Sequence, residues 1–292
     1  IRDRNEVLVF GHLGLPVLGI AGSGCATAII QWMMSLGLAA CFLLAPRRTP
    51  IRVTRPVADL IGQILRLGLP IGGLIALEVS VFATTGILMG LLDADALGAH
   101  QLVINFASLT FMVPLGIGQA ATVRVAFELG ADAPVAAHRA ALAALLLGAC
   151  VMATMAVLMW VAPRMIIGIY LDPADPANRR LVAIALRLLA IAALFQVFDG
   201  VQTIAAGALR GYRDTAVPML LAAFGYWGVG FAGGWALAFP LGYGPIGLWW
   251  GLALGLAVVA TLLTWRLHVR AGATARGAGA LAARIMPVSP AS

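Results

Sequence analysis

The hydrophobic residues of this chain form long, nearly uncharged runs that are separated by short polar segments. A helix needs about 20 apolar residues to cross a bilayer, whereas a transmembrane barrel shows alternating strands of about ten residues. The uncharged run 215–265 is too long for one span, and the Pro- and Gly-rich segment 239–245 divides it. The pattern predicts an all-α, polytopic membrane helix bundle. The expected helices cover residues 17–45, 68–92, 95–128, 137–162, 182–208, 216–238 and 247–266.

Composition supports this prediction of a membrane protein. Of the 292 residues, 62% are hydrophobic and 11% are charged, whereas soluble domains carry about 25% charged residues. The mean hydropathy is +0.98. The net charge of +7 does not indicate nucleic-acid binding, because the basic residues lie between apolar runs and form no single patch. The lipid bilayer is therefore the first expected partner, and no nucleic acid is expected.

The arginines are divided unequally between the two ends of the predicted helices. All 19 basic residues are Arg. Thirteen fall on the side of the connections 46–66 and 210–214 and of the C-terminal tail, and six fall on the other side. Cytoplasmic loops of membrane proteins carry the excess of Arg and Lys. We therefore expect a cytoplasmic C-terminus, with residues 1–16 outside.

A weak internal repeat suggests two lobes. Phe10–Pro16 with Gly22 matches Phe239–Pro245 with Gly251 in several residues, and an apolar run follows each. Residues 46–56 are rich in Pro and Arg, which fits a linker and an ordinary loop equally well, and the repeat favours the linker. A parallel repeat of two six-helix halves is a known transporter plan. We expect the end of an N-terminal lobe, a cytoplasmic linker, a six-helix C-terminal lobe and a cytoplasmic tail, at residues 1–45, 46–66, 67–270 and 271–292.

Two carboxylates fall within the predicted spans. Glu78 lies about nine residues into the second helix. Asp199 lies in the middle of the apolar run 188–209, in which it is the only charged residue. An ionisable group at this depth costs at least about 2.5 kcal/mol and usually faces the bundle interior. The two acids are the predicted cation-binding residues. The alternative is a pair of protonated carboxyl groups that only hydrogen-bond neighbouring helices.

Further polar side chains recur at helical spacing around these acids, and lipid cannot satisfy them. We expect them to line a cavity, although interhelical hydrogen bonding without a ligand fits each of them as well. The possible cavity-lining residues are Gln101, Asn105, Ser108, Gln196, Gln202 and Thr203. An oxygen-rich cavity suits Na⁺, and a carboxylate can hold H⁺ instead. No cofactor is expected, and no metal beyond a transported Na⁺.

Several motifs resemble those of the multidrug and toxic compound extrusion (MATE) transporters. Gly68–Gly72 before Glu78 resembles the seventh helix of that family, and Ala99–Gln101 with Asn105 also resembles a motif of the family. Asp199–Gln202 and the following Gly207–Gly211 resemble the tenth helix and its loop. The resemblance also includes Gly225–Trp227, and it extends from about residue 10 to residue 266.

The resemblance implies twelve helices in two lobes and export of drugs and organic cations against Na⁺ or H⁺. This chain would then supply the C-terminal lobe and the preceding helix, and the missing N-terminal lobe would be its partner. The resemblance assigns Glu78 and Asp199 to the cation site of this lobe. Phe195 stands where related transporters often carry Tyr, which removes one possible ligand. The polar residues 1–6 also depart from the family's apolar fifth helix.

Other functions remain open at this point. A lipid-linked oligosaccharide flippase shares the two-lobe plan, but it would present several cavity-facing arginines to a pyrophosphate. An inactive structural half-transporter is a further alternative. An intramembrane enzyme needs a nucleophile with a base, or metal ligands, at membrane depth, and the four scattered histidines argue against it. We expect no enzyme but an antiporter of cationic or amphipathic small molecules in the bacterial inner membrane.

Overall fold

The computed structural model describes residues 19–44 and 58–285, which belong to two units divided at Pro56. The described part of the first unit is α2 (Gly19–Leu44), a helix of 26 residues without a charged side chain. Its bounds agree with the helix expected at residues 17–45. The second unit holds the remaining elements and is described below by itself.

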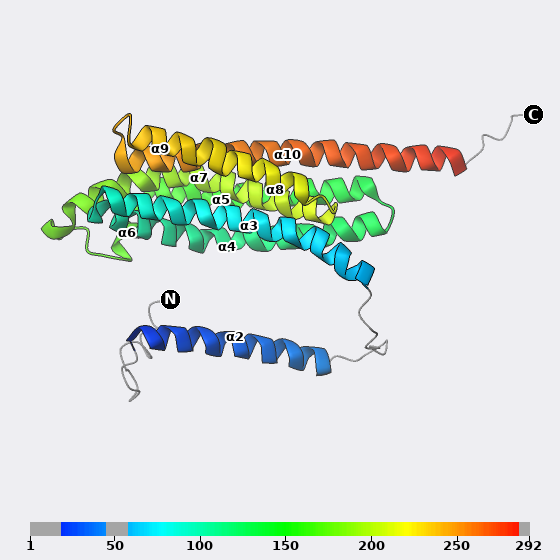
Figure 1. The fold of residues 1–292 in the computed structure, drawn as a ribbon, viewed down its shortest axis with the longest axis horizontal. Coiled ribbons are helices and arrows are strands. Elements are labelled where there is room, and N and C mark those ends of the chain that lie inside the picture. Colours follow the sequence, from blue (N-terminus) through cyan, green and yellow to red (C-terminus); the bar gives the residue numbers. More distant parts are fainter. Residues whose placement is uncertain (1–18, 45–57, 286–292) are drawn as a thin grey trace, which may run out of the picture. The chain divides into compact units, whose positions relative to one another are not determined.

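Long helices make up most of the second unit, and the described residues form no strand. They lie side by side along one direction (Figure 1). The long helices are α3 (Ala58–Leu92), α4 (Ala94–Gly130), α5 (Pro134–Val161), α7 (Arg179–Gly211) and α10 (Gly244–Ile285). Three consecutive segments form one further helical rod, namely α8 (Ala216–Ala223), the π-helical η3 (Phe224–Phe231) and α9 (Ala232–Ala238). The short elements are α6 (Pro163–Gly168) and the 3₁₀ turn η2 (Pro176–Asn178).

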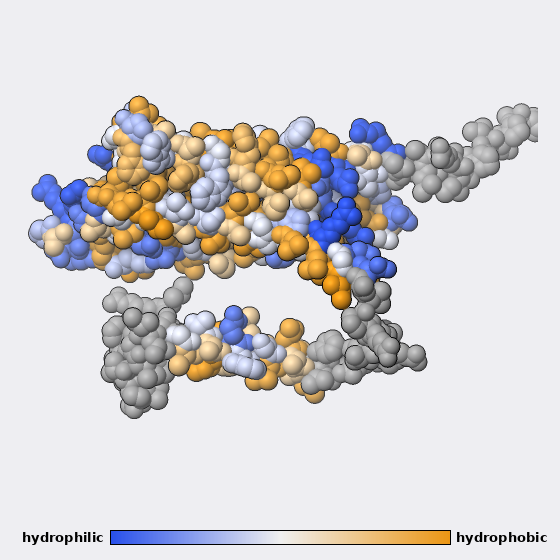
Figure 2. Space-filling view, viewed as in Figure 1, coloured by the Kyte–Doolittle hydropathy of each residue, from blue (hydrophilic) through white to orange (hydrophobic). Residues whose placement is uncertain are grey.

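The helices have the length and the surface of membrane spans. Among the described residues, six helices are long and apolar enough to cross a bilayer, and residues 27–41 of α2 form a shorter apolar helix. These seven coincide with the seven helices expected from the sequence. Large apolar side chains such as Leu146 and Val161 point outward, and hydrophilic residues gather near the two ends of the bundle (Figure 2). The protein is therefore a polytopic helical membrane protein.

Two helices extend further than the apolar runs predicted. α3 begins at Ala58, within the segment expected to be a linker, and α10 continues to Ile285, within the expected tail. Apolar runs mark only the part of a helix that lipid can surround, whereas the backbone hydrogen bonds continue into water where no residue breaks them. The other predictions, for residues 1–18, 45–57 and 286–292, lie outside the described residues.

The connections alternate between the two ends of the bundle (Figure 1). The junction at Asp93 lies at the same end as the α9–α10 turn, and the α4–α5 and α7–α8 turns lie at the other end. Asp93 separates α3 from α4, and its carboxylate accepts a 2.9 Å hydrogen bond from the backbone N–H of Ala96, which caps α4. Gly242 and Gly244 have positive φ angles of 72° and 56° in the α9–α10 turn, as the Pro- and Gly-rich segment predicts.

Helix α7 is the centre of the second unit. It packs most extensively against α4, α10 and α5, and it contributes many of the fully buried side chains, such as Leu188 and Ile204. In contrast, α3 packs against α8 and α4 and comes close to α7 at few points. The space that remains between α3, α4 and α7 holds the candidate site.

Helix α10 packs tightly against α9 and η3 because glycines face each other across the contact. A Cβ atom on Gly251 would overlap the backbone of Gly234, and one on Gly255 would lie 2.7 Å from the Cα of Gly230. Small residues allow membrane helices to approach this closely. In the same rod, a Cβ on Gly233 would meet no atom within 4 Å.

We predict that Gly251→Ala destabilises the protein, because the new methyl group must displace the backbone of α9. Overpacking of this kind costs about 1–3 kcal/mol. The midpoint of thermal unfolding in detergent, followed by size-exclusion chromatography, should fall. The matched control is Gly233→Ala, which should keep the midpoint or raise it slightly because Ala favours helix over Gly. Equal midpoints for the two variants would contradict this account of the contact.

Candidate functional site

A cavity of about 900 Å³ lies in the second unit, and α3, α4 and α7 supply most of its walls. This volume is within the range of small-molecule sites. Six of the eight site residues expected from the sequence line it, and they come from all three helices. The six are Glu78, Gln101, Ser108, Asp199, Gln202 and Thr203.

The two carboxylates face the same cavity from different helices. Asp199 lies in the middle of α7 and is 6% exposed. Glu78 is half-buried on α3 and lies close enough to interact electrostatically with Asp199. Two carboxylates at close range in a medium of low dielectric repel each other when both are charged. A proton, a bound cation or a neighbouring positive side chain would relieve this repulsion.

Asp199 is held by a chain of hydrogen bonds that crosses to the π-helical segment η3. The Gln202 amide Nε2 donates a 3.0 Å bond to Asp199 Oδ1, and the Tyr226 hydroxyl donates a 2.8 Å bond to Gln202 Oε1. All three side chains are buried. Within the described part of the chain, Asp199 Oδ2 has no hydrogen-bond partner, which leaves this oxygen for a proton or a cation.

Two expected cavity residues lie elsewhere. Asn105 is exposed on α4, beside the stripe that lines the cavity and not within it. The stripe passes through Gln101 and Ser108, which are seven residues apart. Asn105, four residues after Gln101, is rotated by about 40° around the helix axis from Gln101 and so points beside the stripe. Gln196 is buried outside the cavity, where the Thr110 hydroxyl lies 3.0 Å from its Oε1. It serves a contact between α4 and α7, as the interhelical alternative predicts.

Four aromatic rings form a series of edge-on contacts beside the polar groups. The ring centroids of Phe82 and Phe195 are 5.8 Å apart, those of Phe195 and Trp249 are 5.6 Å apart, and those of His100 and Trp249 are 5.7 Å apart. Phe82, Phe195 and His100 line the cavity. Phe195 therefore contributes an aromatic wall and no oxygen to the cavity.

Tyr226 and Arg210 are among the cavity residues that the sequence prediction of the site did not include. Tyr226 reaches Gln202 from a different helix, and no spacing within either helix links them. Arg210 lines the cavity from the last turn of α7, where the excess of Arg at one side of the bundle already explains its presence. A search for polar residues at steps of three or four from Asp199 would have included Arg210, which lies eleven residues further along the same face.

Known proteins provide an independent comparison. The MatE family model matches residues 70–236. Multidrug resistance protein NorM of Burkholderia vietnamiensis is 48% identical over 269 residues, which are 91% of this chain and 58% of that protein. The probable multidrug resistance protein NorM of Mesorhizobium japonicum is 48% identical over 266 residues, which are 90% of this chain and 57% of that protein. The chain thus spans somewhat more than half the length of these relatives.

Solved structures agree on the fold. The eukaryotic MATE transporter AtDTX14 superposes with a TM-score of 0.77 at 22% identity, over 94% of this chain and 61% of that one. A MOP superfamily transporter from Pyrococcus furiosus superposes with a TM-score of 0.75 at 16% identity, over 92% of this chain and 59% of that one. At these identities the likeness concerns the fold alone.

We predict that Gln202→Leu destabilises the protein more than Tyr226→Phe. The first change removes the hydrogen-bond partner of both the Tyr226 hydroxyl and Asp199 Oδ1. The second change removes only the partner of Gln202 Oε1. Each buried polar group left unpaired costs about 1–3 kcal/mol. Unfolding midpoints in detergent measure the difference. The control is Gln119→Leu, the same substitution at an exposed position of the cavity, which should have little effect. A loss at Gln119 as large as that at Gln202 would contradict the role of the network.

Proposed function

Because this chain belongs to the MATE family, we propose that it is part of a cation-coupled exporter of drugs and organic cations, for which it supplies the C-terminal lobe and the preceding helix. The chain spans about 58% of its relatives, which agrees with one lobe and part of another. The partner of the lobe would then be the N-terminal lobe, and the cavity would face it.

One observation carries the proposal: Glu78 and Asp199 share a single cavity with amide and hydroxyl groups. Hard cations such as Na⁺ take oxygen ligands, and the two carboxylates with Thr203 offer them. A proton on either carboxylate would relieve the same repulsion. We propose Glu78 and Asp199 as the cation-binding residues, and Gln101, Ser108, Gln202 and Thr203 as the polar lining.

The repulsion between the carboxylates supplies a coupling mechanism. A cation that enters from outside neutralises the pair and favours the state that releases the drug outward. A cationic drug that binds from the cytoplasm favours the cation-free state, because both ligands bring positive charge to one site. For a neutral drug, one cation that moves inward contributes about 2.3 kcal/mol per 100 mV, which corresponds to roughly a fifty-fold gradient of substrate at about 1.4 kcal/mol per tenfold. Exchange of one monovalent cation for a monovalent cationic drug moves no net charge, so the concentration gradient of the ion drives it.

The charge of the cavity favours cationic substrates over a lipid-linked pyrophosphate. Two acidic residues and one basic residue, Arg210, are among those that line it. The aromatic wall of Phe82 and Phe195 suits flat organic cations, since aromatic rings attract cations. A flippase would need several arginines toward its anionic substrate. A half-transporter without activity predicts that removing either carboxylate has no effect on efflux.

We predict that Glu78→Gln and Asp199→Asn each abolish cation-driven drug efflux, because each removes one charge of the coupling pair. The measurement is drug export from cells or proteoliposomes that contain the complete transporter, with an imposed Na⁺ or H⁺ gradient. The control is Glu128→Gln, the same chemical change in an ion pair with Arg124 away from the cavity, which should keep efflux. Full efflux with unchanged ion dependence in both cavity variants would refute the site.

We further propose that the chain lies in the bacterial inner membrane with its C-terminus in the cytoplasm. The excess of arginines lies at the end of the bundle where α7 ends and α8 begins, and positive residues favour the cytoplasm. The end with Asp93 would then face outward.

This orientation predicts the result of cysteine labelling in intact cells, in a background whose three native cysteines are replaced with Ser. Arg139→Cys and Arg270→Cys should stay unlabelled by a membrane-impermeant maleimide, because both exposed positions would lie in the cytoplasm. Asp175→Cys, exposed at the opposite end, should be labelled. Labelling of both Arg positions from outside would reverse the orientation.

A further inference from the structure

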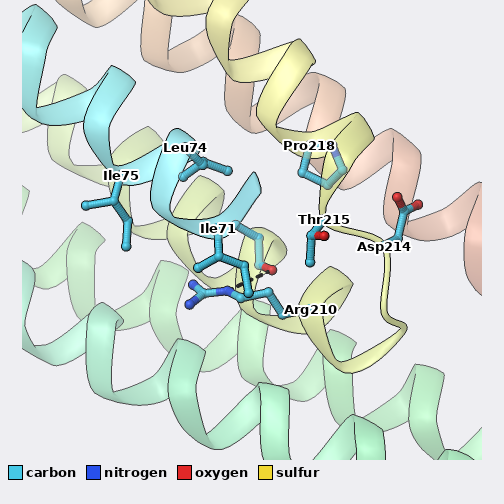
Figure 3. A pocket seen from close by; sticks show the side chains of 8 residues that line it. Ile71, Leu74, Ile75, Arg210, Asp214, Thr215 and Pro218 are labelled. Atoms are coloured by element: carbon cyan, nitrogen blue, oxygen red, sulfur yellow. Dashed lines mark hydrogen bonds between the residues drawn. The ribbon is translucent and has the colours of Figure 1, made fainter. Parts of the chain in front are cut away.

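Arg210 occupies a particular place between the main cavity and a smaller one. It lies in the last turn of α7 and is half-buried. The smaller cavity, of about 20 Å³, shares Leu74, Ile75 and Ala206 with the main cavity, and Arg210 lines both (Figure 3). The guanidinium therefore lies along the end of the main cavity that approaches the α7–α8 turn.

The side chain runs back along α7 toward the carboxylates. Its Nε lies 3.4 Å from the backbone oxygen of Ala206, one turn earlier in the helix. Side chains of a helix point toward its N-terminus, which here is the direction of Asp199. An arginine that only places its charge in water would extend the other way, past the end of the helix. In Figure 3 the guanidinium lies beside Ile71 and Ile75 of α3.

The nearest acidic residue along the chain is engaged elsewhere. Asp214, four residues after Arg210, is buried and forms a 2.8 Å ion pair with Arg266 of α10. Its carboxylate points away from the Arg210 guanidinium (Figure 3). Within the described residues, Arg210 forms no direct ion pair, and the acid that attracts it is Glu78 in the same cavity.

We propose that Arg210 is a tethered counter-ion of Glu78, which competes with the transported cation for this carboxylate. The proposal rests on the proposed function, since it concerns the same cation site. Glu78 shares the main cavity with Asp199 and Arg210, and its charge interacts with both of them. When the cation leaves, the guanidinium compensates the charge of Glu78. When the cation binds, Glu78 turns to the cation and Arg210 is released.

Such a competitor sets the affinity of the site. An uncompensated pair of carboxylates would bind its cation too tightly to release it into the cytoplasm, whereas a built-in positive charge lowers this affinity and assists release. Two carboxylates and one guanidinium also leave a single net negative charge in the cavity, which matches one bound monovalent cation.

The test is the reaction of Glu78 with dicyclohexylcarbodiimide, which modifies protonated carboxyl groups in apolar surroundings. The full chain in detergent is labelled at pH 8, and the modified Glu78 peptide is quantified by mass spectrometry. Removal of the guanidinium favours protonation of Glu78, so Arg210→Gln should label about tenfold faster than the unchanged chain, which corresponds to about 1.4 kcal/mol. Arg210→Lys keeps the charge and should label nearly as slowly as the unchanged chain.

The matched control is Arg213→Gln, the same change of charge at an exposed residue of the following turn, which should not alter the rate. Size-exclusion profiles establish that each variant is folded. Equal rates for Arg210→Gln and Arg213→Gln would overturn the proposal. If Arg210→Gln misfolds, a rate for Arg210→Lys that differs tenfold from the unchanged chain would overturn it as well.

Competition is tested by protection with Na⁺ in the same assay. Less Na⁺ should be needed to protect Glu78 in Arg210→Gln than in Arg213→Gln. If Na⁺ protects neither while the labelling rates differ, the competitor of Arg210 is the proton, and the proposal stands in that form. If the rates differ but efflux survives Glu78→Gln and Asp199→Asn, the pairing is supported, and its role in transport is overturned together with the proposed function.

Discussion

The arrangement of the second unit depends on the cost of two carboxylates at membrane depth. Neither Glu78 nor Asp199 can face lipid without a large penalty, so each must point into a space that supplies polar partners. Helix α7 meets this requirement with Gln202 and, through it, with the Tyr226 hydroxyl. These bonds satisfy Asp199 on one side only, and the remaining charge is what a transported cation would neutralise.

The cavity exists because the helices do not pack with equal closeness. Helix α7 packs against α4, α5 and α10, whereas α3 packs mainly against α8 and α4. The close contact of Gly251 with Gly234 holds α10 against α9, and the tight packing on that side supports the looser packing around Glu78. A bundle of uniform density would close the site, since interiors leave few voids larger than a water molecule.

The sequence predicted the helices well because long apolar runs and one Pro- and Gly-rich turn mark them directly. It predicted less of the side-chain geometry. The four-residue spacing of Gln101 and Asn105 is compatible with one face of a helix. The cavity wall, however, continues from Gln101 to Ser108, and Asn105 lies outside it. Contacts between helices, such as Tyr226 with Gln202, depend on the relative rotation of two helices, and no local spacing records it.

The order of charges along the cavity gives the site a direction. Asp199 lies in the middle of α7, Arg210 lies about 17 Å further along the same helix at 1.5 Å per residue, and Glu78 interacts with both. A cation that approaches Asp199 first meets negative charge alone, whereas one that reaches Glu78 meets the guanidinium as a rival. Binding is then strongest at the end of the site remote from the α7–α8 turn and weakens toward that turn. In the proposed exchange, the transporter opens this graded site to one side of the membrane at a time, and the guanidinium assists release at the end of the site near the α7–α8 turn.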